Sequence, residues 1–399
     1  MTSVVDTSVK YISSSMSGAP TLNGVAGSLI AVLDALLVTG WGLQTATSLV
    51  VSGGVATLTF GSAFPALVGS VILVAGAGVE ALNGEQKVVA VSGNTVSFAT
   101  QADDGTATGT ITARMAPAGW EKVFTGTNLA VYRSLSAEAN GHMLRVDDTG
   151  TQYARVVGYE TMSDVSTGTG LFPTAAQMSG GWYWPKSGAA STVGNAYVVA
   201  ADSRFFLINI APYSYSLATA TRGPIFGFGD LISRRAAGDA YACVLSGNSA
   251  TGMISTGSLD HGANALHAMP RGVAGLGSAV LHYCLPYTGA YNYTSGSDPT
   301  LGAFPSFVDG ELKMSRRFFN TAINTVAGAV RAELPGLYHV PQSLAADTLL
   351  QMAVLTGSGD VAGRNFMVLN GAMQGTTTAT ATASGNAGVS LIDITGPWR

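Results

Sequence analysis

The segment Asn195–Ile210 reads NAYVVAADSRFFLINI and decides how the rest of the chain is interpreted. Two apolar runs flank the polar break Asp202-Ser203-Arg204, a pattern typical of a β-hairpin. Successive side chains of a strand point to opposite faces, so the run Phe205–Ile208 places apolar groups on both faces. We therefore predict that this hairpin lies inside a layered β domain and is covered on both sides.

The composition indicates a globular chain with few charges. Its 399 residues are 47% hydrophobic and only 11% charged, whereas an ordinary soluble domain has about a quarter charged residues. A chain of this length can bury a large core, in two or three domains. So few charges indicate a surface of uncharged polar residues that is covered, in part, by partner proteins.

The charge pattern argues against two classes of partner. The net charge is -4, and the 19 Lys and Arg residues are scattered, so no basic stripe is present for a nucleic acid. The most apolar window, Val25–Val38, contains Asp34 and is shorter than the roughly 20 residues of a membrane span, so no membrane insertion is expected. It also lies behind a Ser-rich start, unlike a signal peptide, so we expect a protein used without export.

The first 45 residues are expected to form an arm and a helix. Residues 1–20 are small and polar and are typical of an extended arm that docks on another surface. From Leu22 to Val38 apolar residues recur at spacings of three and four, which predicts an amphipathic helix packed on its own domain, with a subunit contact as the alternative. Asn23 is the expected N-cap, and Gly40-Trp41-Gly42 the expected end.

Two β domains are predicted to follow, which makes the fold class mainly β. Residues 46–114 show short strands separated by turns such as Ser52-Gly53-Gly54 and Ser92-Gly93-Asn94, a spacing that predicts a small antiparallel sandwich or barrel. The composition shifts at Met115–Gly119, where we place the boundary. Residues 115–399 are expected to form a larger antiparallel β domain, again a sandwich or barrel.

Three stretches carry a resemblance to a known family. They are the arm and helix from Lys10-Tyr11-Ile12 to Gly40-Trp41-Gly42, the block Ala116–Lys122, and the ending Ile392–Arg399. Together they resemble an uncharacterised family of virion structural proteins of tailed bacteriophages, and Phe226–Asp230 and Leu334–Tyr338 are consistent with it. The small domain, with Ala81–Gly84 between its strands, is similar to the immunoglobulin-like (Ig-like) β-sandwich modules of phage tails and capsids.

The resemblance implies a structural role and supplies no catalytic residues or cofactors. It implies a non-enzymatic structural protein of the virion, assembled in the cytoplasm of the bacterial host, that packs as a homo-oligomer against other phage virion proteins. A tail-tip or baseplate position is expected first, and capsid decoration is the alternative. A receptor-binding adhesin that recognises a host-surface glycan is the other alternative.

The candidate chemical residues are expected to be structural. Asp103-Asp104, Asp147-Asp148, Asp230 and Asp239 stand beside Gly or Thr in what we interpret as idle turns, so a glycan hydrolase with facing carboxylates is the weakest hypothesis. Asp260-His261 and His267 show no shared face, so no metal site is predicted. Cys243 and Cys284 are expected to be buried thiols rather than a disulfide.

Two aromatic clusters are the candidate binding residues. Flat rings with a polar handle suit sugars and protein interfaces alike, and domain cores or interfaces are the more common use. The ending Pro397-Trp398-Arg399 is expected to be a docked terminus. The possible glycan or interface aromatics are Trp182, Tyr183, Trp184, Tyr287, Tyr291 and Tyr293.

Overall fold

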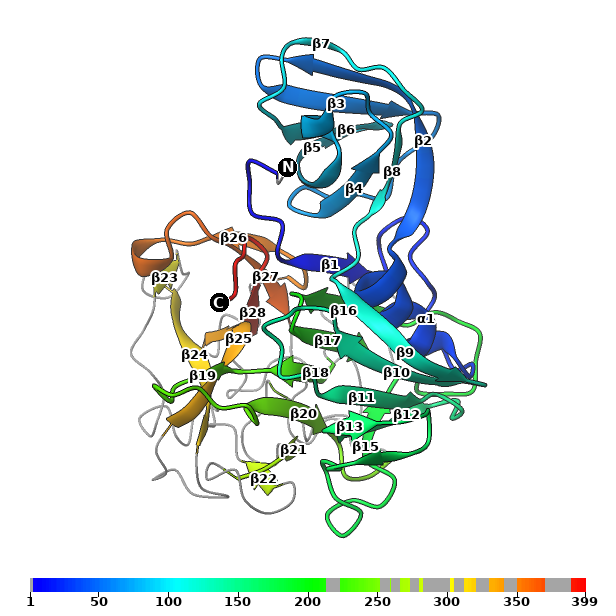
Figure 1. Cartoon of the computed structure of the whole chain (residues 1–399), viewed down its shortest axis with the longest axis vertical. Coiled ribbons are helices and arrows are strands. Elements are labelled where there is room, and N and C mark those ends of the chain that lie inside the picture. Colours follow the sequence, from blue (N-terminus) through cyan, green and yellow to red (C-terminus); the bar gives the residue numbers. More distant parts are fainter. Residues whose placement is uncertain are drawn as a thin grey trace.

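The computed structural model confirms a mainly β protein, in which strands make up 46% and helices 6% of the residues. A small barrel projects from a larger body of several sheets (Figure 1). The structure describes residues 3–212, 223–251, 259, 266–272, 280–282, 302–304, 312–320, 330–340, 350–369 and 389–399.

The small domain is a closed barrel of six antiparallel strands. The strands pair in the order β3-β6-β5-β4-β8-β2, and a further pairing of β2 with β3 closes the ring. Of the sandwich and the barrel that the sequence allowed for this domain, the strand pairing is that of a closed barrel. The strands are β2 (Trp41–Ser52), β3 (Val55–Phe60), β4 (Val71–Ala75), β5 (Gly84–Ser92), β6 (Thr95–Ala99) and β8 (Thr112–Met115), with the short β7 (Gly105–Thr106) on β2 and a 3-10 turn η2 (Glu80–Leu82).

The length of β2 is the physical reason that the barrel closes. Its 12 residues pair with β8 near Trp41–Thr45 and with β3 from Ala46 onward, and a register shift in each pairing bends the strand. Alternate residues of β3 point inward, so Ala56, Leu58 and Phe60 are buried. The barrel is thus filled by its own side chains.

The predicted helix is present but is shorter and is capped differently. It runs through α1 (Ser28–Leu33) and continues as a π-helix, η1 (Asp34–Thr39), before Gly40 ends it with a φ of 69°. Asn23 is not the N-cap; Gly27 holds that position and has no cap of its own. Within the described residues, no helix has the length and apolar character needed to cross a membrane.

The N-terminus of the helix is capped by a buried ion pair whose residues lie far along the sequence. Oδ2 of Asp148 accepts hydrogen bonds from the backbone N–H groups of Leu29 (2.8 Å) and Ile30 (3.2 Å). Its Oδ1 bonds Lys186, whose Nζ also donates to the Val25 carbonyl at 2.8 Å. Both charged side chains are fully buried; burial raises the pKa of Asp148 and lowers the pKa of Lys186. The pair therefore fixes the helix to the larger body.

The predicted hairpin lies at the centre of the larger body, as expected. Its two strands, β16 and β17, pair antiparallel from Ala196↔Ala211 to Ala201↔Phe206, and every residue of both is buried. They belong to a seven-stranded sheet, formed in order by β1 (Lys10–Ser13), β16 (Ala196–Ala201), β17 (Phe205–Ala211), β18 (Ile225–Asp230), β20 (Cys243–Gly247), β21 (Leu266–Met269) and β22 (Val280–His282).

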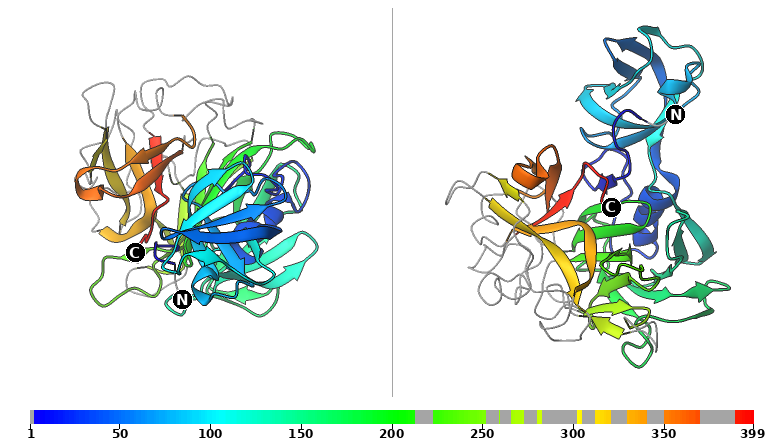
Figure 2. Two further views of the ribbon diagram at one scale, coloured as in Figure 1. Left: turned by 90° about the horizontal axis from the view of Figure 1, so that it is seen from above. Right: turned by 60° about the vertical axis from the view of Figure 1, so that its left-hand side comes forward.

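Two further sheets complete the larger body (Figure 2). One contains β15 (Trp182–Pro185), β12 (Tyr153–Tyr159), β11 (Met143–Asp147), β10 (Leu129–Ser134) and β9 (Trp120–Gly126), next to a ribbon of β13 (Thr161–Met162) and β14 (Gly168–Thr169). The other contains β23 (Gly302–Phe304), β24 (Leu312–Asn320), β25 (Val330–Val340), β28 (Val389–Asp393), β27 (Asn365–Leu369) and β26 (Val354–Thr356), with β19 (Ile232–Ser233) on β25 and a 3-10 turn η3 (Gly359–Val361).

The central hairpin is covered on both faces. On one face the ring of Phe206 meets Trp120 of β9 edge-on, with ring centres 5.5 Å apart, and Trp184 of β15 edge-on at 6.1 Å. On the other face Asn209 accepts a hydrogen bond of 2.8 Å from Gln351, which lies just before β26. This two-sided cover is what the alternation of apolar residues predicted.

The N-terminal arm docks on its own chain. Strand β1 pairs antiparallel with β16, from Lys10↔Ala201 to Ser13↔Val198, and all four of its residues are buried. The arm also reaches the barrel, because Lys10 forms an ion pair of 2.9 Å with Glu85 of β5. The arm is therefore the edge strand of the central sheet and a link between the two domains.

Replacement of Trp184 by Ala tests the packing of the central layer. The indole is fully buried and stacks on Phe226 with ring centres 5.9 Å apart. We expect Trp184→Ala to lower the free energy of unfolding by about 3–5 kcal/mol in urea titrations. The control is Leu135→Ala, whose side chain is 62% exposed and should change stability by less than about 0.5 kcal/mol. Equal effects of the two changes would contradict the layered core.

Removal of the arm tests the role of β1. Deletion of residues 1–13 would leave the edge of β16 unpaired, so we expect the thermal midpoint of the larger body to fall by at least about 5 °C. Deletion of residues 1–5 alone removes no part of β1 and should leave the midpoint unchanged. An unchanged midpoint in the longer deletion would show that β1 is dispensable for folding.

Candidate functional site

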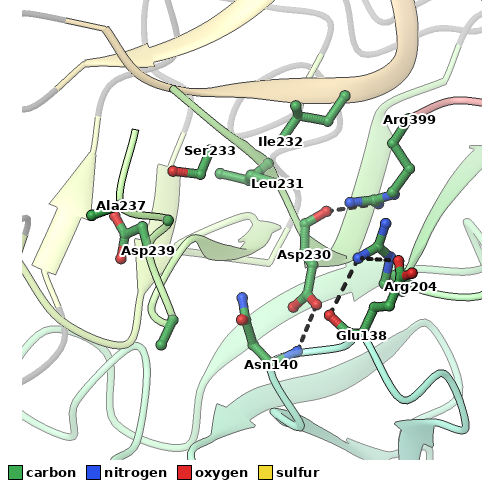
Figure 3. Close-up of a pocket in the computed structure, with 12 residues that line it drawn as sticks. Glu138, Asn140, Arg204, Asp230, Leu231, Ile232, Ser233, Ala237, Asp239 and Arg399 are labelled. Carbon is green, nitrogen blue, oxygen red and sulfur yellow. Dashed lines mark hydrogen bonds and ion pairs between the residues drawn. The ribbon is translucent and has the colours of Figure 1, made fainter. Parts of the chain in front are cut away.

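A pocket of about 470 Å³ lies on the larger body where five separate segments meet (Figure 3). These segments are the loop after β10, the β16–β17 turn, the end of β18 with β19, the loop before β20 and the C-terminal residue. The lining residues are Glu138, Asn140, Arg204, Asp230, Leu231, Ile232, Ser233, Ala237, Gly238, Asp239, Ala240 and Arg399.

The cations of the pocket are already paired. Arg204 forms an ion pair of 3.2 Å with Glu138. Arg399 donates from Nε to Asp202 at 2.9 Å and from a terminal nitrogen to the Asp230 carbonyl, also at 2.9 Å. An anionic ligand would therefore have to displace a carboxylate of the protein from one of these arginines, which argues against a phosphate or sulfate site.

The carboxylate of Asp239 belongs to a buried network rather than to the pocket. It accepts hydrogen bonds from Arg331 Nε at 2.8 Å and from a terminal nitrogen at 3.3 Å, and both side chains are almost fully buried. Arg331 also donates to the Arg271 carbonyl at 2.8 Å, and Arg271 pairs with both oxygens of Glu160. The network joins β25 to the central sheet and to the turn after β12.

Asp230 is the chemically distinctive group of the pocket. Its Oδ2 accepts a hydrogen bond of 2.8 Å from the backbone N–H of Asn140 (Figure 3). It also lies beside His142 and Cys243, and one ligand atom from each of these three residues lies within 4.8 Å of the others. All three residues are buried.

Burial changes the pKa values of all three groups. It raises the pKa of Asp230 to about 6, against the opposing effects of the Asn140 hydrogen bond and of the charges of Arg399 and Arg204. It lowers the pKa of His142 to about 4 and raises the pKa of Cys243 well above its ordinary value. At pH 7 a carboxylate, a neutral imidazole and a neutral thiol therefore lie side by side.

The predicted aromatic residues do not come together at this pocket. Trp182 and Trp184 are fully buried between the sheets, so their rings are not open to a sugar; the Trp184 indole N–H donates to the Ser246 carbonyl at 2.7 Å. Tyr183 is half-buried under Arg155, whose guanidinium lies 3.9 Å from the ring centre. Tyr287, Tyr291 and Tyr293 lie outside the described residues.

Several polar residues that we interpreted as idle turns prove to be buried. Asp148 and Asp230 are buried and the Asp239 side chain is only 1% exposed, and all three accept hydrogen bonds, which corrects that interpretation, whereas Asp103 and Asp104 are exposed. His267 is buried on β21, and Asp260, His261 and Cys284 lie outside the described residues. Cys243 is a buried free thiol, as expected.

The C-terminus is docked, as the sequence indicated. The Trp398 ring is 7% exposed, and its N–H donates to the Asp393 carbonyl at 2.8 Å. The ring lies against the backbone at Gly336, where an added Cβ would stand 2.2 Å from the indole. Only glycine fits there, so Gly336 of β25 allows the Trp398 ring to pack directly against the strand.

Comparison with protein-family models gave no match, and comparison with curated proteins gave none either. The interpretation of the site therefore rests on its own geometry.

The Arg399 contacts can be tested by substitution. Arg399→Ala would leave the buried Asp202 carboxylate without its cation, so we expect the free energy of unfolding to fall by about 1–3 kcal/mol. Arg399→Lys keeps the charge but loses the forked geometry and should lose less. Urea unfolding of both variants is the measurement, and an unchanged stability of Arg399→Ala would show that the terminus is not held by these bonds.

Proposed function

We propose that this chain is a non-enzymatic structural subunit of a tailed-phage virion. In this role it assembles with copies of itself and with other virion proteins, at the tail tip or baseplate. The observation that carries the proposal is the outer surface of the projecting barrel, together with the stretches of sequence that resemble the phage family.

The barrel carries a large share of the exposed apolar side chains. Of the fourteen large apolar side chains exposed in the described residues, seven belong to the barrel: Leu43, Val50, Val55, Leu67, Val68, Val79 and Val89. Val50 and Val55 stand on the outer face of the β2–β3 hairpin, because their neighbours Leu49, Val51 and Ala56 point inward. Exposed apolar groups concentrated on one small domain favour a contact surface for other proteins.

The interior of the barrel supports the same interpretation. Phe60 and Phe98 are almost fully buried there together with Leu49, Leu58 and Val96. A small barrel filled in this way acts through its outside, and its position at one end of the molecule leaves that outside accessible (Figure 1). The low content of charged residues also suits a subunit that buries much of its surface on assembly.

Nothing in the described residues favours the adhesin or the hydrolase over this role. The glycan hypothesis rested on Trp182, Tyr183 and Trp184 and on three tyrosines that lie outside the described residues; of the first three, Trp182 and Trp184 have their rings in the core. The hydrolase hypothesis needs two accessible carboxylates that face each other. Among the carboxylates considered for that role, Asp148 and Asp239 are each bonded to a buried cation, and Asp230 is buried against the Asn140 backbone.

The barrel surface is tested first in the purified protein. Val50→Lys with Val55→Lys would place two charges on the outer face of the β2–β3 hairpin. We expect the wild type to associate with itself in sedimentation experiments and this double variant to associate roughly tenfold more weakly. Thr45→Lys with Thr47→Lys is the matched control on exposed positions of β2 and should behave as the wild type. Equal association of all three proteins would remove the hairpin from the proposal.

The position on the particle is tested by immunogold labelling of intact phage with an antibody to the folded protein. We expect gold at the tail end. Gold over the head would replace the baseplate position by capsid decoration. Absence of gold from particles whose surface the antibody can reach would contradict the proposal that this chain is an exposed subunit of the virion.

A further inference from the structure

Three potential metal ligands meet in the interior beside the pocket. His142, Asp230 and Cys243 each offer one ligand atom, and these atoms lie within 4.8 Å of one another. Asp230 and Cys243 lie on the neighbouring strands β18 and β20, whereas His142 lies far from both in the sequence, just before β11. The arrangement therefore depends on how the central sheet and the five-stranded sheet pack together.

The register of the central sheet places two of the ligands. Asp230 ends β18 and Cys243 begins β20, and the two residues stand directly opposite each other in the antiparallel pairing. Cross-strand neighbours of this kind point to the same face of the sheet, with Cβ atoms about 5 Å apart. Phe228 and Asp230 are two residues apart on one strand, so their side chains lie on the same face of the central sheet. On that face Phe228 contacts Trp120 of the five-stranded sheet, which we call the covering sheet.

The covering sheet supplies the third ligand. His142 precedes β11, and the backbone N–H of the nearby Asn140 bonds Oδ2 of Asp230, which ties this loop to the end of β18. The imidazole packs edge-on against Phe172, with ring centres 5.7 Å apart, and Phe172 stacks on Phe228 at 6.3 Å. Phe172, itself held against Phe228, thus packs on the imidazole and limits its orientation.

A second observation, independent of the ligand spacing, concerns the hydrogen bonding of the His142 imidazole. The His142 side chain belongs to a residue that is only 7% exposed, and its Nδ1 has no hydrogen-bond partner among the described residues. A buried polar atom without a partner destabilises the folded state, so such atoms are rare and call for an explanation. A bound cation would supply the partner.

We propose that His142, Asp230 and Cys243 form a binding site for one zinc ion. An imidazole nitrogen, a thiolate sulfur and a carboxylate oxygen are the three ligand types that zinc takes in proteins, and softer or harder ions accept this mixture less well. Around tetrahedral zinc the ligand atoms lie roughly 3.5 Å apart. Because the three atoms lie within 4.8 Å of one another, each distance would shorten by at most about 1.3 Å when the ion binds. Asp230 also lines the pocket, so a water molecule entering from there would complete the fourth position around the ion.

The bound ion would act as a cross-link in the fold. It would join β18 and β20 of the central sheet to the start of β11 in the covering sheet. On binding, the Cys243 thiol releases its proton to solvent and the thiolate bonds the metal, with no change of oxidation state. This inference does not depend on the proposed virion role, and either can fail without the other.

Cobalt(II) titration of the full-length protein, after treatment with a chelator, tests the site. We expect one cobalt per chain, with the near-ultraviolet charge-transfer band of a cobalt–thiolate bond and the visible bands of tetrahedral coordination. Zinc should then displace the cobalt and raise the thermal midpoint of the wild type. No thiolate band, or a stoichiometry well below one, would overturn the proposal.

Matched variants assign the ligands. Cys243→Ala should abolish the charge-transfer band, whereas Cys284→Ala, the other cysteine of the chain, should retain it. Asp230→Asn is nearly isosteric and should weaken cobalt binding roughly tenfold or more. A band that persists in Cys243→Ala or disappears in Cys284→Ala would place the metal elsewhere. If Cys243→Ala does not fold, the cadmium-113 NMR chemical shift of the cadmium-loaded wild type decides whether the thiolate is a ligand. We expect a shift typical of one sulfur ligand, and a shift typical of no sulfur ligand would refute the site.

Discussion

Burial of the central sheet on both faces is the constraint on which the rest of this structure depends. The strands β16, β17, β18 and β20 carry apolar residues on both faces of the sheet, and all of their residues are buried. A sheet of this kind is stable only when other elements cover both faces. The five-stranded sheet provides one cover through Trp120 and Trp184, and the segment around Gln351 lies on the opposite face.

Layers packed in this way bury polar groups, and the protein satisfies them mainly in pairs. Lys186 with Asp148 and Arg331 with Asp239 are ion pairs whose side chains are almost completely removed from water. Such pairs contribute little net stability, because desolvation offsets their attraction, but loss of one member leaves an uncompensated buried charge. Their effect is to fix which segments meet: the first pair holds the helix, and the second holds β25.

The group of His142, Asp230 and Cys243 lies at the same kind of boundary between layers. The two ion pairs satisfy their own charges within the protein, whereas this group leaves an imidazole nitrogen with no hydrogen-bond partner in the part of the chain that the structure describes. The projecting barrel shows the complementary arrangement, with a filled interior and apolar groups on its outside. The larger body thus holds the two buried ion pairs and the three-residue group, and the barrel carries seven of the fourteen large apolar side chains exposed in the described residues.

The sequence by itself determined the elements whose signals are local. Two apolar runs around a polar break in Asn195–Ile210 predicted the central hairpin, spacing predicted the helix that Gly40 ends, and closely spaced turns predicted the small β domain. Tertiary structure alone decided the barrel closure, the capping of the helix by Asp148, the burial of Trp182 and Trp184, and the meeting of His142 with Asp230 and Cys243. The physical reason is that these contacts join residues separated by about ten to more than a hundred positions, whose partners are fixed by strand register and layer packing rather than by local pattern.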